Sequence, residues 1–387
     1  MGKGFEMVMI REYDPTRDLT SVEELEKSCE VGSLLVDLMG DPLARIRQSP
    51  SFHMLVAEIG DEIVGIIRGT IKMVTRGGYT LLDRSDVSPE ISTTKLAFVS
   101  GLRVSPFYRR MGIGLKLVQR IEDWFRRNGA AYAYVQTEND NTASVKLFTE
   151  KTGYSKFRTP TFLVNPVFNH RATVSNRVKI INLAPSVAES LYRNRFSSTE
   201  FFPSDINSIL ANKLSLGTYM ALPRGSDYVP SSLPDPTDSW AVLSIWNSKE
   251  VYKLQVQGTS RLKRILAKTT RVFDGVFPFL KIPSFPNLFK PFSMHFLYGI
   301  GGEGPRAVEM VEALCSHAHN IARKSGCSVV AAEVASCEPL RVGVPHWKLL
   351  SPEDLWCLKR LRDDDDGGVD WTKSTPGLSI FVDPRDL

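Results

Sequence analysis

A turn that contains two arginines and two glycines holds the residues of this chain best suited to bind an anion. It follows the apolar run 95–104, carries Arg109 and Arg110, and leads through Gly112 and Gly114 into a predicted helix. The first amides of a helix have no intrahelical acceptors and carry partial positive charge. Glycines leave those amides open to a ligand, and the arginines add cationic donors at the rim. The turn therefore predicts a phosphate cradle.

The spacing of this turn separates it from other nucleotide-binding loops. Its pattern is Arg-x-x-Gly-x-Gly, without the third glycine of a dinucleotide-binding turn and without an obvious ribose-binding acid after the following strand. No GxxxxGK[ST] segment occurs, which argues against nucleotide hydrolysis. A tight turn whose glycines serve packing alone is the remaining alternative, because short glycine motifs also match by chance.

The same turn resembles motif A of the GNAT acetyltransferase superfamily, V-x-P-x-x-R-x-x-G-x-G. The matching residues are Val104, Pro106, Arg109, Gly112 and Gly114. The segment NTASVKLF at 141–148 resembles motif B of that superfamily. Further segments across the chain, such as YGIGGEGP at 298–305 and PHWK at 345–348, resemble the plant Hookless family of probable N-acetyltransferases.

This resemblance implies acetyl-CoA as the cofactor and gives roles to the residues around the turn. Arg109 would stand at the rim, and the pyrophosphate would lie on the amides of Arg110, Met111, Gly112, Ile113, Gly114 and Leu115. In this fold the strand before the turn splays from its neighbour, so Leu102 and Val104 would offer backbone groups to the pantetheine arm. The Leu102 N–H would polarise the thioester carbonyl. Asn141 would either contact the cofactor arm or cap the helix that it begins.

The side chains that often transfer protons in this superfamily are missing from their usual places. Phe98 stands where some members have a glutamate, and Leu-Phe-Thr at 147–149 stands where many have a tyrosine. The interval from Leu-Phe to the next glycine is also one residue longer than usual. Glu138 is the candidate general base, with a surface or capping carboxylate as the alternative. Tyrosines at 108, 134 and 154 lie nearby in the sequence.

The elements expected around the turn make this half of the chain mixed α/β. Two apolar runs at 52–59 and 62–72, separated by Gly-Asp, predict a hairpin. Ser21 and Glu24 predict a capping box at the head of a helix. The other elements expected are a strand at 95–104, a helix at 112–127, a strand at 130–137, a helix at 141–150 and a strand at 153–164.

A similar order of elements returns after residue 178. The runs 240–247 and 251–257 predict a second hairpin, and strands are expected near Leu355 and Leu378. A strand at 294–300 leads through a glycine turn to a helix at 305–324 and a strand at 328–334. We interpret that second glycine turn as a retained fold element without a cofactor. The prediction is a GNAT catalytic domain at 1–170 and a C-terminal domain at 171–387, a degenerate GNAT-like copy.

Composition sets the broad class of the protein. The chain has 387 residues, of which 42% are hydrophobic and 24% charged, as in ordinary globular proteins. Its net charge of +5 is mild, and no nucleic-acid-binding motif accompanies it. No stretch has transmembrane length, and no metal site is expected because the cysteines and histidines lack ligand spacing.

Two functions remain open at this stage. One is an acetyl-CoA-dependent N-acetyltransferase whose acceptor is a protein or peptide amine, a lysine or an N-terminus, and resemblance to the Hookless family implies histones among its substrates and a role in plant growth. The other is an acetyl-CoA-binding sensor or scaffold that has little or no activity. Five cysteines without paired spacing indicate a reducing compartment, and nucleus or cytoplasm is expected. The sequence leaves the oligomeric state open.

Overall fold

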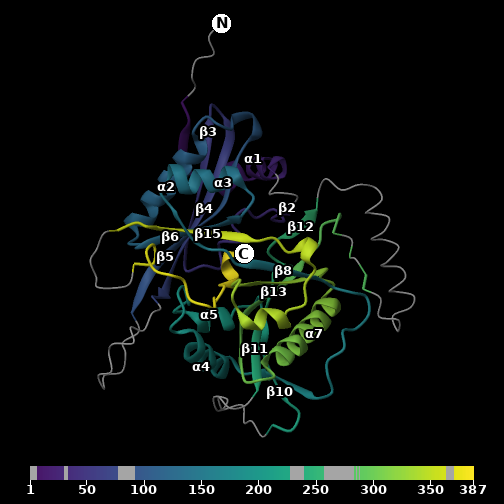
Figure 1. Ribbon diagram of the computed structural model, residues 1–387. Helices are drawn as coiled ribbons and strands as arrows, with labels where there is room; N and C mark the ends of the chain where they lie inside the picture. Colours follow the sequence, from purple (N-terminus) through teal and green to yellow (C-terminus); the bar gives the residue numbers. More distant parts are fainter. Residues whose placement is uncertain are drawn as a thin grey trace, which may run out of the picture.

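Two mixed β-sheets, one above the other in Figure 1, form the body of the molecule. The computed structural model describes residues 7–29, 34–76, 92–226, 239–256, 283–284, 286, 288–362 and 370–387. Within these ranges the first sheet has the strand order β1 (Met9–Glu12), β3 (Ser51–Ile59), β4 (Glu62–Thr75), β5 (Thr93–Val104), β6 (Tyr132–Glu138), β15 (Asp354–Arg360) and β7 (Ser155–Arg158). The second has the order β8 (Thr161–Pro166), β14 (Val329–Val334), β13 (Met294–Glu303), β11 (Trp240–Asn247), β10 (Ser215–Pro223) and β9 (Val178–Leu183).

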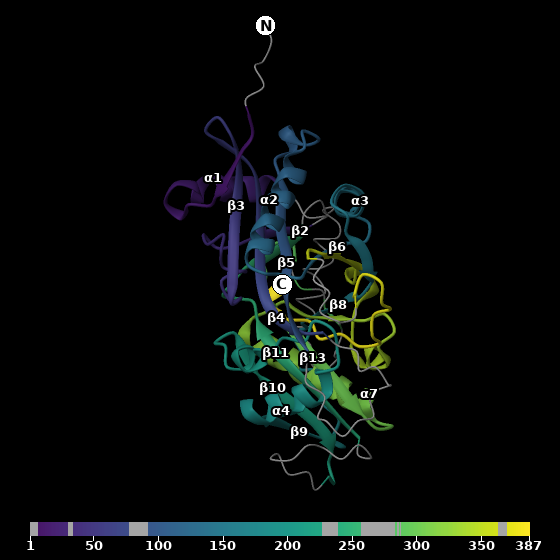
Figure 2. The same cartoon turned by 90° about the vertical axis from the view of Figure 1, so that its left-hand side faces the viewer.

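Helices cover the outer face of each sheet and part of the inner face of the first sheet. The apolar stripe of α2 (Ile113–Arg127), with Leu117, Ile121 and Phe125 completely buried, packs on one face of the first sheet. The opposite face carries α1 (Pro15–Ser28), whose Val22 and Leu25 contact the core beside β3 and β4. On the second sheet, α7 (Ala307–Ser325) covers the face that is turned away from the first sheet (Figure 2). Both sheets are therefore protected from water on their outer sides.

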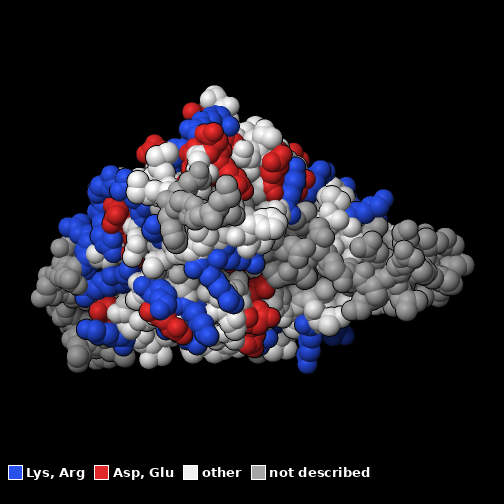
Figure 3. Space-filling model, turned by 90° about the horizontal axis from the view of Figure 1, so that it is seen from above, with Lys and Arg blue, Asp and Glu red and all other residues white. Residues whose placement is uncertain are grey.

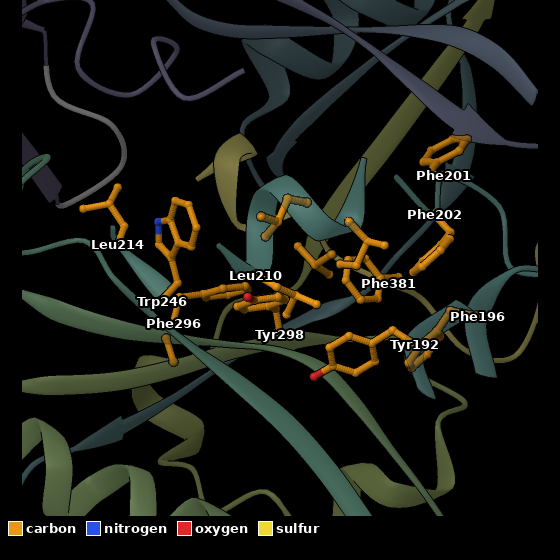
Figure 4. Close-up of a cluster of buried hydrophobic side chains, with 14 of the residues drawn as sticks. Tyr192, Phe196, Phe201, Phe202, Leu210, Leu214, Trp246, Phe296, Tyr298 and Phe381 are labelled. Atoms are coloured by element: carbon orange, nitrogen blue, oxygen red, sulfur yellow. The ribbon is translucent and has the colours of Figure 1, made fainter. Parts of the chain in front are cut away.

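The largest core cluster lies between the two sheets. Phe98, Tyr134 and Trp356 reach it from the first sheet, and Phe296 and Tyr298 reach it from the second. Two short helices, α4 (Pro185–Phe196) and α5 (Ile206–Leu210), add further side chains to it. Figure 4 shows the C-terminal segment entering this cluster through Phe381. Its ring centroid lies 5.7 Å from that of Tyr192, 5.3 Å from that of Phe196 and 5.0 Å from that of Phe202.

The two halves of the chain exchange one strand each. In the first sheet the parallel pair β5–β6 is joined through α2, and in the second the parallel pair β13–β14 is joined through α7. Beside β6 lies β15, from the end of the chain, and beside β14 lies β8, from the first half. A boundary at residue 170 therefore does not separate the two sheets. The shared order supports a degenerate second GNAT-like domain, which stays a prediction.

The strand expected at 153–164 is wrong in one respect, because it is two strands in different sheets. β7 joins the first sheet and β8 the second. Pro160 stands between them, and a proline has no N–H for a strand ladder and restricts the residue before it. The Pro160 carbonyl instead accepts a hydrogen bond from the Asp354 amide at 3.0 Å. This break is what lets the chain pass from one sheet to the other.

Three other local predictions are wrong. The first helix begins at Pro15 with Asp14 as its cap, because the Asp14 carboxylate accepts the Thr16 amide at 2.9 Å; Ser21 lies inside the helix. The run 251–257 does not pair with β11; its strand, β12 (Lys253–Val256), pairs with β2 (Leu34–Asp37) in a separate two-stranded sheet. The segment around Leu378 forms no strand. The hairpin β3–β4 and the helix α2 are confirmed.

Candidate active site

The turn between β5 and α2 has the geometry of an anion cradle. A short 3-10 turn, η1 (Pro106–Tyr108), follows the strand, and α2 begins with Gly112 as its cap in the left-handed region at φ 79°. Arg110 also has a positive φ of 64°. Among the described residues, the amides from 110 to 115 have no hydrogen-bond acceptor. A ligand with phosphate oxygens is the natural partner for such a row of donors.

Open space in front of Gly112 completes the cradle. A Cβ built at this residue would meet nothing within 4 Å, so no protein atom occupies the space that a ligand would need. Gly114 differs, because a Cβ there would be in ordinary contact with Leu147 and Val104. Arg109 and Arg110 are exposed at the rim, and Arg109 Nε donates to the Val104 carbonyl at 3.4 Å. The turn thus has room and donors for a diphosphate, and its binding of the acetyl-CoA pyrophosphate stays a prediction.

Basic side chains continue from the cradle along α2. Figure 3 views the molecule from the end that carries β3, α1 and α2, and Lys and Arg side chains gather on its left, where α2 lies. The helix contributes exposed Lys116, Arg120 and Arg127 to this surface. Asp123 is also exposed there, and Glu122 is buried beneath the helix. The surface favours the negatively charged end of a nucleotide cofactor.

β5 and β6 separate beyond the middle of the sheet. Their parallel pairing ends at Val99 and Val135, although β5 continues to Val104 and β6 to Glu138. A bulge in the β4–β5 ladder, between the pairs Arg68–Ser100 and Ile66–Arg103, accompanies the separation. Bulges add twist and re-aim the residues that follow them. The splay that the resemblance implied is therefore present beside Leu102 and Val104; their contacts with the cofactor stay predictions.

Asn141 lies at the start of α3 (Thr142–Lys146), on the far side of the opening. Its side-chain oxygen accepts the Ser144 amide at 3.1 Å, so it caps the helix. Its side-chain amide group stays a predicted contact to the cofactor. The helix continues into a π-helical turn, η2 (Leu147–Lys151). A π turn takes up one additional residue, which accounts for the longer interval before Gly153.

Glu138 lies at the end of β6, on the same face as Tyr134 and opposite α2. Burial raises the pKa of its carboxyl group, and Asp140 raises it further. Directly across the β6–β15 ladder stands Asp354, which shares this face. Burial raises the pKa of Asp354 to about 7, and the Glu138 carboxylate adds to the shift. A raised carboxyl pKa suits a general base near neutral pH, and Glu138 as that base stays a prediction.

No sequence pattern predicted that the Asp354 carboxylate lies here. It lies more than two hundred residues beyond Glu138, and only the strand exchange brings it into the first sheet. Glu333 of β14, in the second sheet, is buried nearby and accepts the Trp356 indole N–H at 2.7 Å. Its pKa is raised well above the ordinary value by burial and then by Asp354. A group of acids therefore stands between the sheets, behind Glu138.

Two of the three tyrosines near the turn in sequence are unsuited to donate a proton to a thiolate. Tyr134 is buried, and its hydroxyl bonds to Asp386 in the C-terminal segment. Burial raises the pKa of Tyr134 and of Tyr154 well above the ordinary value. Tyr108 is bonded to Glu62 at 2.7 Å on the surface. Phe98, at the position of the missing glutamate, packs against Tyr134 with ring centroids 4.7 Å apart.

The second sheet opens in the same way but is filled by the protein itself. Pairing of β13 with β14 ends at Leu297 and Ala332, and the space beyond is lined by Ile380 and Val382 from the C-terminal segment. At the start of α7, the guanidinium of Arg306 is paired with Glu309 at 2.9 Å. These contacts fit the interpretation of the second glycine turn as a fold element without a cofactor.

The fold and the cradle define an acyl-CoA-dependent transferase of the GNAT type. Residues 19–154 match the Acetyltransferase (GNAT) family. The chain is 61% identical over 403 aligned residues to the probable N-acetyltransferase HLS1 of Arabidopsis thaliana, across 98% of this chain and all of that protein. It is 37% identical to acetyl transferase GW6a of Oryza sativa subsp. japonica, across 98% of both chains.

Two solved structures share the fold over 92% of this chain. One is Saccharomyces cerevisiae N-myristoyltransferase with bound myristoyl-CoA, with a TM-score of 0.56, 9% identity and 79% of that chain covered. The other is the GCN5-related glucosamine N-acetyltransferase region of a fungal multi-domain GH3 β-N-acetylglucosaminidase, with a TM-score of 0.56, 14% identity and 38% of that chain covered.

The chain therefore belongs to the GNAT acetyltransferase family, among the Hookless-like N-acetyltransferases. It is an N-acetyltransferase, and acetyl-CoA is its cofactor. Among the described helices, none combines the length and the apolar character that crossing a bilayer would require. The described residues also contain no group of three or more His, Cys, Asp or Glu side chains arranged to hold a metal ion.

Proposed function

We propose that this enzyme transfers the acetyl group of acetyl-CoA to an amine of a protein or peptide, a lysine or an N-terminus, with histones among the candidate acceptors. The observation that carries the proposal is the opening between β5 and β6 beside unpaired amides at the start of α2. The row of unpaired amides lies next to the opening between the two strands. Together they suit a long cofactor with a charged head and an extended arm.

In this proposal some residues around the opening bind the cofactor and others take part in the reaction. The amides of 110–115 and the guanidinium of Arg109 hold the pyrophosphate, and backbone groups of Leu102 and Val104 hold the pantetheine arm, with Asn141 as a further contact. Bound acetyl-CoA supplies the acetyl group as a thioester. The Leu102 N–H stabilises the negative charge that develops on the carbonyl oxygen. Glu138 takes the proton from the acceptor amine, directly or through a water.

The location and the wider role are also proposals. We infer a nuclear or cytoplasmic location, which rests on the cysteine spacing and on the resemblance to the Hookless family, and a role in plant growth, which rests on that resemblance alone. A fluorescent fusion expressed in plant cells tests the location. Fluorescence confined to a membrane-bound organelle other than the nucleus would contradict it.

Purified protein, acetyl-CoA and a panel of histone and N-terminal peptides test the transferase proposal. Free CoA thiol and peptide mass are followed together, so that transfer is separated from thioester hydrolysis. The variant Arg109→Glu/Gly112→Asp serves as the control, because it places negative charge where the diphosphate binds. Peptide-dependent acetylation that the variant lacks would support the proposal; cofactor binding without transfer to any peptide would contradict it.

The role of Glu138 has its own test. We expect Glu138→Gln to lower kcat by about 10²- to 10⁴-fold, the range for removal of a general base. It should also remove the rise in rate with pH that accompanies ionisation of Glu138. Glu150→Gln is the matched control, because Glu150 is an exposed carboxylate on η2. Unchanged turnover and an unchanged pH profile in Glu138→Gln would exclude it as the base.

A further inference from the structure

Three arginines gather on the acceptor side of the opening between β5 and β6. Leu102 and Val104 pack toward α2 on one face of the sheet, so Arg103, which stands between them, points to the opposite face. That is also the face of Glu138, on the other side of the opening. Arg68 and Arg45 lie on this side as well, close enough to Arg103 for each to lower its pKa. We call these three residues the arginine cluster.

The Arg68 side chain is held in place beside the bulge of β5. A Cβ built on Gly101, which has a φ of 59°, would lie 2.5 Å from an Arg68 terminal nitrogen, so the guanidinium is packed against the bulge. Arg68 Nε donates to the Pro42 carbonyl at 2.7 Å, and its Nη2 lies 2.7 Å from the Glu26 carboxylate. The Arg68 charge is therefore paired.

Arg103 has no such carboxylate. Among the described residues it donates to the carbonyl of its neighbour Leu102, at 2.9 Å, and forms no ion pair. Arg45 Nε donates to the main-chain oxygen of Leu387 at 2.9 Å, and its guanidinium lies 5.3 Å from the centre of the Tyr252 ring. Both are partly exposed, so a ligand can reach them.

Arg103 lies near two other guanidinium groups, those of Arg68 and Arg45, and near one carboxylate, Glu26, that is already paired with Arg68. Burial lowers the pKa of Arg103 to about 10, and Arg68 and Arg45 oppose the effect of Glu26. Burial likewise lowers the pKa of Arg45. A partly buried charge without an ion-pair partner is costly, so a bound anion would stabilise Arg103.

We propose that the acceptor of this enzyme carries a carboxylate close to the amine that is acetylated, and that Arg103, assisted by Arg45 and Arg68, binds this carboxylate. The inference rests on the proposed function, because it assigns the acceptor to the face that carries Glu138. Arg103 and Glu138 stand on opposite sides of the same opening. The acceptor amine therefore lies toward Glu138 while its carboxylate lies toward Arg103. An acidic side chain and the α-carboxylate of a chain end offer the same chemistry.

Matched lysine peptides test this inference. In the first pair, one peptide carries Asp or Glu beside the lysine and the other carries Asn or Gln there. The two peptides of the second pair differ only in a free or amidated C-terminus next to the lysine. We expect kcat/KM for the carboxylate member of a pair to exceed that for its neutral partner by about tenfold to a hundredfold, the range for a charge-assisted hydrogen bond. The pair that discriminates identifies the source of the carboxylate.

Variants of Arg103 test whether the arginine cluster causes the preference for carboxylate peptides. Arg103→Met should reduce the ratio between carboxylate and neutral peptides by about tenfold or more, and Arg103→Lys should restore part of it. Arg177→Met is the control for loss of one exposed arginine, and it should retain the full ratio. Equal kcat/KM within both pairs, or a full ratio in Arg103→Met, would overturn the inference while leaving the transferase proposal standing.

If no peptide is acetylated, the affinities of the peptides test the inference instead. In the presence of CoA, the fluorescence anisotropy of labelled peptides gives their affinities without turnover. Absence of acetylation would then count against the proposed function alone. Tighter binding of the carboxylate peptides, lost in Arg103→Met, would support the cluster as a binding site; equal affinities would contradict it.

Discussion

Replacing Gly112 with alanine isolates what this glycine does for the cofactor. Its φ of 79° is a backbone conformation in which a Cβ costs about 1–2 kcal/mol, so the variant should be destabilised by that amount. No protein atom lies within 4 Å of the added Cβ, and no clash contributes. The new methyl group occupies space that the diphosphate needs in order to reach the amides of α2.

The loss of affinity follows from those hydrogen bonds. Each charge-assisted bond contributes about 1.5–3 kcal/mol, so displacing the diphosphate from one amide should weaken acetyl-CoA binding by about tenfold to a hundredfold. Isothermal titration calorimetry gives the affinity, and urea unfolding gives the stability of the same sample.

Gly326→Ala is a matched control for the backbone strain. Gly326 has a φ of 77°, and a Cβ there also meets nothing within 4 Å, but it follows α7 in the second sheet's half of the molecule. Both variants should therefore lose similar stability, and only Gly112→Ala should lose affinity. Equal affinity for acetyl-CoA in the two variants would refute the assignment of the cradle.

Two further predictions concern the contact between the sheets. Phe381→Ala should lower the free energy of unfolding in urea by about 3–5 kcal/mol, because the ring is buried among aromatic side chains. The control Leu378→Ala, in the same segment but 68% exposed, should change it by less than about 0.5 kcal/mol. Similar losses in the two variants would contradict the packing described. Burial raises the pKa of Asp354 to about 7, whereas a carboxyl group in the unfolded chain has a pKa of about 3.9. Between these pH values the folded state binds more protons than the unfolded state, so the free energy of unfolding should fall as pH rises from about 4 to 7. Asp354→Asn should flatten that fall, and parallel stability profiles for the two proteins between pH 4 and 8 would count against it.

Sequence reasoning succeeded where the signals were local. The glycine turn, the hairpin β3–β4 and the helix α2 follow from spacing and turn residues within a short stretch of chain. The misplaced start of α1 is also local, since Asp14 followed by Pro15 is itself a helix-start signal that outweighs Ser21. The pairing of β12 with β2 could not be predicted, because the partners lie more than two hundred residues apart.

The sequence by itself determined the conformation of the glycine turn, because the left-handed conformation of Gly112 and the free amides after it depend only on neighbouring residues. It also determined the family, through the spacing of arginine and glycines. Only the tertiary structure decided the surroundings of Glu138 and Arg103. Asp354 reaches Glu138 through an exchanged strand, and Arg45, Arg68 and Arg103 meet from separate parts of the chain. Burial and charge depend on groups that folding brings together from distant positions, so no local pattern could indicate them.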